Sequence, residues 1–183
     1  MTTAKSLNRD KLNEMFEYRD GILLYRKNPN RSVSRIGTRA GWVRPNGYRM
    51  VIVDGEEYRE HRVIWAMHYG DIEAGQIVDH RDGNESNNTL SNLRAASETY
   101  NRLNQRMRKG RKGQYKGVCW DKSRNRWMAR LKIGDTTYYI GRFDTAEEAA
   151  IAYDNKAREL CPEYTTLNFP VAGERSAHTG DIV

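Results

Sequence analysis

The chain has 183 residues, which suits one ordinary domain or two small ones, and 38 % of the residues are hydrophobic. Lys and Arg outnumber Asp and Glu by 31 to 24, and the resulting charge of +7 favours a polyanionic partner, nucleic acid before an anionic membrane surface. An aromatic content of 10 % excludes a disordered chain, and the two cysteines, Cys119 and Cys161, cannot form a CxxC zinc framework or a disulfide scaffold.

The sequence has no run of about 18 apolar residues, so we expect no membrane span. Its first residues, MTTAKSLNRDKL, lack the apolar core of a signal peptide. We therefore expect a cytoplasmic protein, located in the bacterial host cell if a phage encodes it. We expect residues 1–15 to be loosely ordered and to carry no function.

The next part of the chain alternates short apolar runs with turn sequences. Strands are predicted over 21–25, 41–43, 48–53 and 56–60. Asp54 and Gly55 lie between the last two runs and indicate a hairpin. Apolar residues at helical spacing predict a short helix over 61–70, which ends at Gly70.

Residues 77–105 carry the strongest functional signal. An apolar strand ends at Val78, and Asp79 and His80 follow at its tip. A polar, turn-rich loop, DGNESNN, comes next, and Leu90 and Leu93 anchor a short return segment. Ser97 is a plausible N-cap for a following helix.

A strand tip and the face of the following helix can bring Asp79, His80 and Asn101 to one point. A carboxylate and an amide oxygen are hard ligands that suit Mg²⁺ or Mn²⁺. The imidazole can activate a water for attack on phosphorus, and the metal can stabilise the charge that grows on the phosphate. Taken singly, each residue has an ordinary interpretation, because an Asp beside a His is usually a surface pair and asparagines are usual in turns.

The spacing of His80, Asn92 and Asn101, together with the DH, DGN, NN and NLR blocks, resembles the phage and intron-associated branch of the HNH endonucleases. Asparagine replaces the last histidine of the name motif at Asn101. The resemblance implies a strand–hairpin–helix (ββα-metal) site with His80 as general base and one divalent cation, Mg²⁺ or Mn²⁺, held by Asp79 and Asn101. Asn92 would brace the loop that aims His80. Arg94 or His61 would touch the scissile phosphate. No small-molecule cofactor is expected.

Positive charge is concentrated between Tyr100 and Lys132, where twelve basic residues face one acid, Asp121. Aromatic residues interleave with them, a pattern that favours phosphate contacts over a merely solvated surface. The middle of this stretch has two glycines and no apolar periodicity. We therefore predict a nuclease domain over 1–106 with its catalytic core at about 77–105, a basic linker over 107–114 that lies along the DNA backbone, a second domain over 115–170 and a loosely ordered tail over 171–183.

The second domain begins with two runs of period-two apolar residues around the turn DKSRNR, and TTYYIGRF forms a third strand. Thr145 and Glu148 form a capping box at the start of a helix with an alanine-rich face. The fold class is therefore α+β: an HNH ββα-metal module followed by a three-stranded antiparallel sheet packed on one helix.

YKGV…W, YIGRFDTAEEAAIAYD and the final LNFP resemble the plant APETALA2/ethylene-response DNA-binding domain, which reads duplex DNA with its sheet in the major groove. The resemblance gives eight candidates for DNA contact: Lys116, Trp120, Lys122, Arg124, Arg126, Arg130, Lys132 and Tyr139. Several arginines of the plant proteins are replaced here, so their sequence preference does not carry over.

The leading hypothesis is a phage-type or mobile-element endonuclease of the homing type that nicks double-stranded DNA as a monomer. One active site per chain predicts a nick with 5′-phosphate and 3′-hydroxyl ends. The alternatives are a non-catalytic, sequence-specific DNA-binding regulator on a retired nuclease fold, and an RNA-binding protein. A sheet shaped for a wide major groove fits B-form DNA better than A-form RNA.

Overall fold

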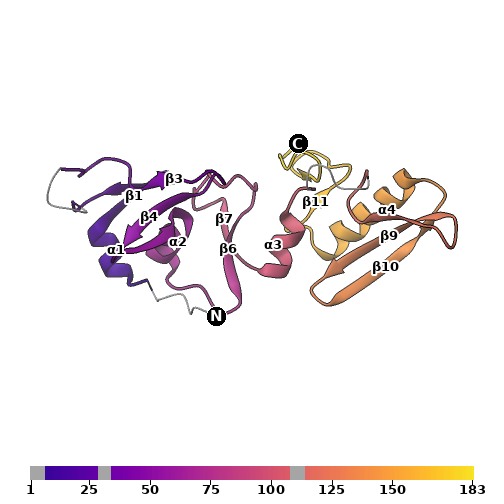
Figure 1. The fold of residues 1–183 in the computed structure, drawn as a ribbon, viewed down its shortest axis with the longest axis horizontal. Helices are drawn as coiled ribbons and strands as arrows, with labels where there is room; N and C mark the ends of the chain where they lie inside the picture. Colours follow the sequence, from indigo (N-terminus) through magenta and orange to yellow (C-terminus); the bar gives the residue numbers. More distant parts are fainter. Residues whose placement is uncertain (1–6, 29–33, 108–113) are drawn as a thin grey trace. The chain divides into compact units, whose positions relative to one another are not determined.

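A computed structural model describes residues 7–28, 34–107 and 114–183 (Figure 1). The chain divides into two compact units, which are described separately. The first unit comprises Met1–His80 and Asn84–Ala95, and the second comprises Arg81–Gly83 and Ala96–Val183. The predicted basic linker at 107–114 falls largely outside the described residues, because 108–113 are not among them.

Short helices and strands build the first unit. They are α1 (Arg9–Met15), β1 (Phe16–Arg19), β2 (Ile22–Tyr25), β3 (Trp42–Val43), β4 (Arg49–Val53), β5 (Glu56–Arg59), α2 (Glu60–Tyr69) and β6 (Gln76–His80), followed by β7 (Leu93–Ser97), which runs into the second unit. The predicted β4–β5 hairpin and the predicted short helix are confirmed. The β1–β2 hairpin was not predicted. Strands β6 and β7 pair as a two-stranded sheet.

The hairpin turns follow from local chemistry. Asp54 and Gly55, between β4 and β5, have φ angles of 53° and 81°, the left-handed values that a two-residue hairpin turn requires. Asp20 and Gly21 repeat this arrangement between β1 and β2, with φ angles of 46° and 86°. These turns fix the register that sends the apolar side chains of both hairpins into one core.

Helix α1 corrects the expectation of loose order for residues 9–15, whereas residues 1–6 of that prediction lie outside the described residues. Asn8 caps it by accepting a hydrogen bond from Lys11 N, and Leu12 is completely buried. Leu12 packs in one core with Phe16 and with the apolar stripe of α2, which includes Val63, Ile64 and Met67. Burial of this single apolar face explains why so short a helix is stable in the protein.

The second unit contains the sheet and helix that the sequence predicts. Strands β8 (Val118–Asp121), β9 (Arg126–Ile133) and β10 (Thr136–Phe143) form an antiparallel sheet in the order β10-β9-β8. Helix α4 (Ala146–Leu160) begins with the predicted capping box of Thr145 and Glu148. Its small buried residues, Ala149, Ala150 and Ala157, let the helix lie close against β9 (Figure 1).

Helix α3 (Glu98–Asn104) begins at the predicted cap, where Ser97 Oγ accepts a hydrogen bond from Tyr100 N. Leu103 of this helix is buried in the core of the second unit, beside Val118 and Leu131. The contact boundary between the units therefore falls at Ala96, ahead of the boundary that we expect from composition near residue 106.

The C-terminal residues also differ from the prediction, because 171–183 are not a loosely ordered tail. Strands β11 (Thr166–Leu167) and β12 (Arg175–Ser176) pair in parallel. The buried guanidinium of Arg175 donates to the carbonyl oxygens of Gly180 and Asn104. These backbone acceptors fix the segment by contacts that have no periodic signature in the sequence.

No helix within residues 7–28, 34–107 and 114–183 combines the length and apolar character that crossing a bilayer requires.

Candidate active site and DNA-binding face

The last two residues of β6 are Asp79 and His80, and both side chains are buried, with exposed fractions of 8 % and 4 %. Their position at the end of a strand agrees with the prediction. Because neighbouring residues of a strand point to opposite faces, the two side chains meet different partners.

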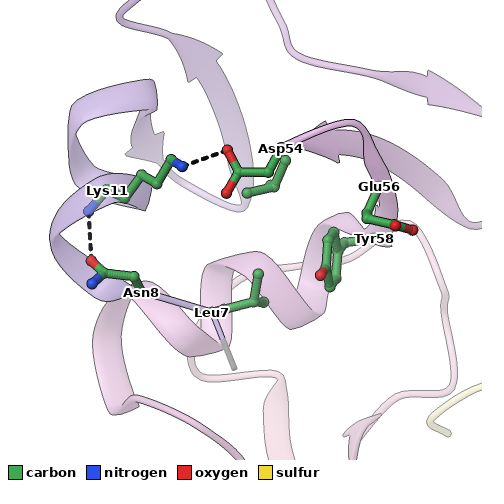
Figure 2. A pocket seen from close by; sticks show the side chains of 7 residues that line it. Leu7, Asn8, Lys11, Asp54, Glu56 and Tyr58 are labelled. Atoms are coloured by element: carbon green, nitrogen blue, oxygen red, sulfur yellow. Dashed lines mark hydrogen bonds and ion pairs between the residues drawn. The ribbon is translucent and has the colours of Figure 1, made fainter. Parts of the chain in front are cut away.

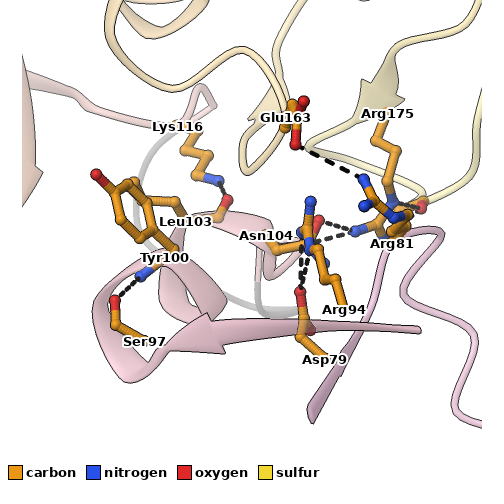
Figure 3. Close-up of polar contacts among 11 residues, drawn as sticks. Asp79, Arg81, Arg94, Ser97, Tyr100, Leu103, Asn104, Lys116, Glu163 and Arg175 are labelled. Carbon is orange, nitrogen blue, oxygen red and sulfur yellow. Dashed lines mark hydrogen bonds and ion pairs between the residues drawn. The ribbon is translucent and has the colours of Figure 1, made fainter. Parts of the chain in front are cut away.

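Asp79 forms a buried ion pair with Arg94 of β7 (Figure 3). Its Oδ2 accepts hydrogen bonds from Nε and Nη2 of Arg94 at 3.0 and 2.8 Å. Arg94 is only 4 % exposed, and its guanidinium is charge-paired with the carboxylate that we predicted as a metal ligand. The structure therefore gives Arg94 a carboxylate partner, and its contact with the scissile phosphate stays a prediction.

His80 is held by a chain of hydrogen bonds that reaches the start of α2. Its Nε2 lies 2.8 Å from Oδ1 of Asn88, and Nδ2 of Asn88 donates to Oε2 of Glu60 at 2.8 Å. The other oxygen of Glu60 accepts the backbone N–H of Leu23 at 3.0 Å. Each of these side chains is at most 4 % exposed, so little solvent competes with the chain of bonds.

Burial raises the pKa of Glu60, and the N–H of Leu23, the guanidinium of Arg39, the amide of Asn88 and the guanidinium of Arg49 oppose that shift. Arg39 Nη2 and Arg49 Nε lie 3.6 and 3.9 Å from Oε2 of Glu60. A buried carboxylate with two donated hydrogen bonds and two nearby guanidinium groups has the surroundings that an ionised acid needs.

His61 lies against His80, with ring centroids 4.8 Å apart in an edge-to-face arrangement. Burial lowers the pKa of His61 well below 6.5, and the nearby His80, Arg59 and Arg62 lower it further. A neutral imidazole can donate one hydrogen bond to a phosphate but brings no positive charge. Tyr48 packs beside both rings, and Arg59 lies 4.4 Å above the centroid of its ring.

Asn92 braces the loop between β6 and β7. Its Nδ2 donates to the carbonyl oxygen of Asn87 at 2.7 Å, immediately before Asn88 in the chain. This is a backbone contact of the kind predicted for Asn92. Its consequence for catalysis stays a prediction.

Asn101 lies on α3 and is half-buried. This helix belongs to the second unit, whereas Asp79 and His80 belong to the first, so the joint ligation of a metal by Asp79 and Asn101 stays a prediction. Over the described parts of the chain, no group of three or more His, Cys, Asp or Glu side chains is placed to hold a metal ion. One carboxylate and one amide oxygen nevertheless fit the donor chemistry of Mg²⁺ or Mn²⁺, which usually keep water ligands and bind substrate phosphate as well.

Sequence reasoning missed Glu60 and Asn88. Glu60 falls on the same helical face as Ile64 and Met67, and this spacing is a signal that its side chain would be buried. Asn88 has no comparable signal, because it stands in a run of polar turn-forming residues.

The face of the second unit's sheet that points away from α4 carries positive charge. Ala129 and Leu131 are buried toward the helix, so alternation along β9 places Arg126, Arg130 and Lys132 on the opposite face. The strand register sets Tyr139 beside Arg130 on that face, and its side chain is exposed. Lys122 and Arg124 are exposed in the turn between β8 and β9.

Two predicted DNA contacts have different surroundings from the others. Trp120 lies on the same face of β8 as the buried Val118, and it is paired across the strands with Trp127. Trp127 packs against the core under α4, so Trp120 lies on the sheet face that the helix covers. Lys116 Nζ donates to the carbonyl oxygen of Leu103 at 2.6 Å (Figure 3). It also donates to Thr166 Oγ1 at 2.7 Å. Lys116 therefore has internal acceptors with which a phosphate must compete.

A hollow on the first unit lies among α1 and the β4–β5 hairpin (Figure 2). The pair Lys11–Asp54 crosses it at 2.5 Å, and Leu7 and Tyr58 contribute apolar surface. None of the predicted catalytic residues lines this hollow.

Comparison with known families gives a match in two separate parts of the chain. An HNH endonuclease family matches residues 58–103, and the AP2 domain family matches residues 113–162. Protein 3.8 of Escherichia phage T7 is 32 % identical over 102 residues, which cover 56 % of this chain and 84 % of that protein.

Two further relatives match about half of this chain. The DNA endonuclease I-HmuI of Bacillus phage SP01 is 31 % identical over 96 residues, which are 52 % of this chain and 48 % of that protein. The ethylene-responsive transcription factor ERF069 of Arabidopsis thaliana is 32 % identical over 101 residues, which are 51 % of this chain and 59 % of that protein. No solved structure matches the chain significantly.

Proposed function

Because the chain belongs to the HNH endonuclease family and carries a second domain of the AP2 type, we propose that it hydrolyses phosphodiester bonds of double-stranded DNA with one divalent cation, Mg²⁺ or Mn²⁺. The observation that carries this proposal is the buried His80, next to Asp79 at the end of β6 and fixed by Asn88. A buried histidine with a fixed ring orientation is suited to proton transfer, unlike a histidine that is simply solvated at the surface.

His80 accepts the proton of the attacking water. Its Nε2 faces Asn88, so the proton is taken up at the other ring nitrogen, Nδ1. Asp79 and Asn101 would hold the divalent cation, and the cation would neutralise charge on the phosphate and the leaving oxygen. Arg94 orients the carboxylate of Asp79 through two hydrogen bonds to Oδ2. The products carry 5′-phosphate and 3′-hydroxyl ends.

The exposed basic face of β8–β10 binds duplex DNA and gives the enzyme its site preference. Arg126, Arg130 and Lys132 can contact phosphates and base edges, and Tyr139 can stack or donate a hydrogen bond. One catalytic histidine per chain makes a nick the expected product, with a monomer bound to DNA. The phage origin of two of the relatives supports a phage or mobile-element source and an intracellular, homing-type role.

The test is cleavage of supercoiled plasmid in Mg²⁺ or Mn²⁺ by the native chain and by His80→Ala, with EDTA as a control. Loss of a general base lowers the single-turnover rate by about 10²–10⁴-fold while duplex affinity stays unchanged. His68→Ala, a histidine of α2 outside the proposed site, is the matched control and should cleave at the native rate. Duplex binding without metal-dependent cleavage by the native chain would replace this proposal with a DNA-binding regulator.

A further inference from the structure

Glu60 is a completely buried carboxylate to which no part of the proposed cleavage assigns a role. Both of its oxygens are engaged, Oε1 by the N–H of Leu23 and Oε2 by Nδ2 of Asn88. A buried charge is seldom the most stable choice at a core position, because desolvation offsets much of what its partners contribute. The second of these partners leads directly to His80.

The chemistry of a carboxylate fixes the direction of every bond in this chain. An ionised Glu60 can only accept hydrogen bonds, so the Asn88 atom that faces it is the amide nitrogen. The Asn88 atom that faces His80 is then the carbonyl oxygen, which can only accept. Nε2 of His80 therefore carries a proton, and the lone pair of the neutral ring is on Nδ1.

We propose that Glu60 is a positioning residue for DNA cleavage, which acts through Asn88 to hold His80 in the tautomer whose basic nitrogen is Nδ1. This inference rests on the proposed role of His80 as general base. It goes further by assigning the choice between the two ring nitrogens to a carboxylate two hydrogen bonds away. Leu23 anchors the chain of bonds, because a backbone N–H cannot exchange donor for acceptor.

The variant Glu60→Gln tests the direction of the chain of bonds. The new side-chain amide has one acceptor oxygen, which the fixed N–H of Leu23 requires, so the amide nitrogen faces Asn88. Asn88 must then rotate by half a turn to present its own oxygen to that nitrogen, which places its NH₂ group against Nε2 of His80. The proton of the neutral His80 ring then moves to Nδ1, and Nδ1 loses the lone pair that accepts a proton from the attacking water. We expect the single-turnover rate to fall at least ~100-fold, with the KM for DNA unchanged.

A second substitution should reverse that loss. Asn88→Asp alone places two carboxylates face to face in a buried site, which forces one of them to take up a proton. In the double variant Glu60→Gln with Asn88→Asp, the amide and the carboxylate exchange places. The amide at position 60 then donates to the carboxylate at position 88, and this carboxylate accepts the proton of Nε2 of His80, so the native tautomer returns. We expect the double variant to cleave within ~10-fold of the native rate, although Glu60→Gln alone loses at least ~100-fold.

The tautomer can be measured without any cleavage. The ring nitrogen-15 shifts of a neutral histidine distinguish a protonated Nε2 from a protonated Nδ1, and the chain has only four histidines to assign. The native chain and the double variant should show His80 protonated at Nε2, and Glu60→Gln should show it protonated at Nδ1. Glu57→Gln, which removes an exposed ion pair with Arg44 in the same unit, is the matched control and should change neither the rate nor the tautomer.

These measurements separate two kinds of failure. If the native chain does not cleave DNA, the proposed function fails, and with it any role for Glu60 in cleavage. If the native chain cleaves but Glu60→Gln keeps both the native rate and a protonated Nε2, this inference is overturned and the proposed function stands. A folded double variant that is no more active than Glu60→Gln also overturns the inference, because a merely structural role predicts additive losses rather than rescue.

Discussion

The active-site strand β6 and the sheet β8–β10 both carry charged side chains, but they hold them in opposite ways. In the first unit, Asp79, Arg94 and Glu60 are at most 8 % exposed, and each has hydrogen-bonded partners. In the second, Arg126, Arg130 and Lys132 stand exposed on a sheet face. The first arrangement suits chemistry, which needs fixed positions, and the second suits a polyanion, which is bound by many individually weak contacts.

The same comparison separates the two kinds of ion pair. The pair Asp79–Arg94 is buried, and removal of either residue would destabilise the folded state, because the charge of the other would stay buried. The pair Asp121–Arg142 lies in the sheet and is more exposed, with side-chain exposures of 14 % and 35 %, so solvent screens it more than the buried pair. Substitutions in the first unit should therefore change stability and the rate of cleavage, and substitutions on the sheet should change affinity for DNA in small steps.

The largest expected effect on folding comes from Arg94→Met. It removes the guanidinium and with it the two hydrogen bonds to the buried carboxylate of Asp79, which should lower the free energy of unfolding by about 3–5 kcal/mol. Urea denaturation followed by circular dichroism measures this loss. Arg102→Met, which removes an exposed ion pair with Glu98, is the matched control and should change stability by less than about 1 kcal/mol. Equal losses in the two variants would contradict the distinction between buried and exposed pairs.

An intermediate effect is expected from the double substitution Arg130→Ala with Lys132→Ala. Removal of two exposed cations from the proposed DNA-binding face should weaken duplex binding by about 10-fold or more and reduce the slope of log affinity against log salt by about 2. Fluorescence anisotropy at several salt concentrations measures both quantities. The cleavage rate at saturating DNA should stay at the native value.

Lys156→Ala is the control for that experiment, because Lys156 lies on α4 and pairs with Glu159. It should leave the salt slope unchanged. A loss of affinity equal to that of the sheet variant would show that binding depends on overall charge and has no preference for the sheet face.

The smallest effect concerns the pKa of Asp121. Hydrogen bonds from Ser123 and then from Arg142 lower the pKa of this carboxyl from 3.8 to about 2. A lowered acid pKa stabilises the folded state above the unfolded value of 3.8, and the contribution is lost as the pH falls through about 2. Carbon-13 NMR of the Asp121 carboxyl should give a midpoint near 2 in the native chain. Ser123→Ala should move that midpoint toward 3.8, and an unmoved midpoint would assign the shift to Arg142 and the backbone N–H of residue 123.

Local sequence determined much of this molecule. The Asp54–Gly55 turn, the Ser97 cap and the capping box at Thr145 were each predictable, because their chemistry involves residues at most three apart in the chain. Alternation likewise predicted which face of β9 carries Arg130 and Lys132. The spacing of His80, Asn92 and Asn101 indicated the nuclease family, and a family match over residues 58–103 confirms it.

The tertiary structure decided the partners of the polar side chains. Arg94 pairs with Asp79, Lys116 with the end of α3 and Arg175 with carbonyl oxygens, and each of these contacts joins residues between 5 and 71 positions apart. Sequence periodicity indicates which side chains are buried, but it does not indicate which buried donor meets which acceptor. The connection from Glu60 through Asn88 to His80 spans 28 and then 8 positions, so folding alone brings this carboxylate into the chain of bonds that orients the proposed base.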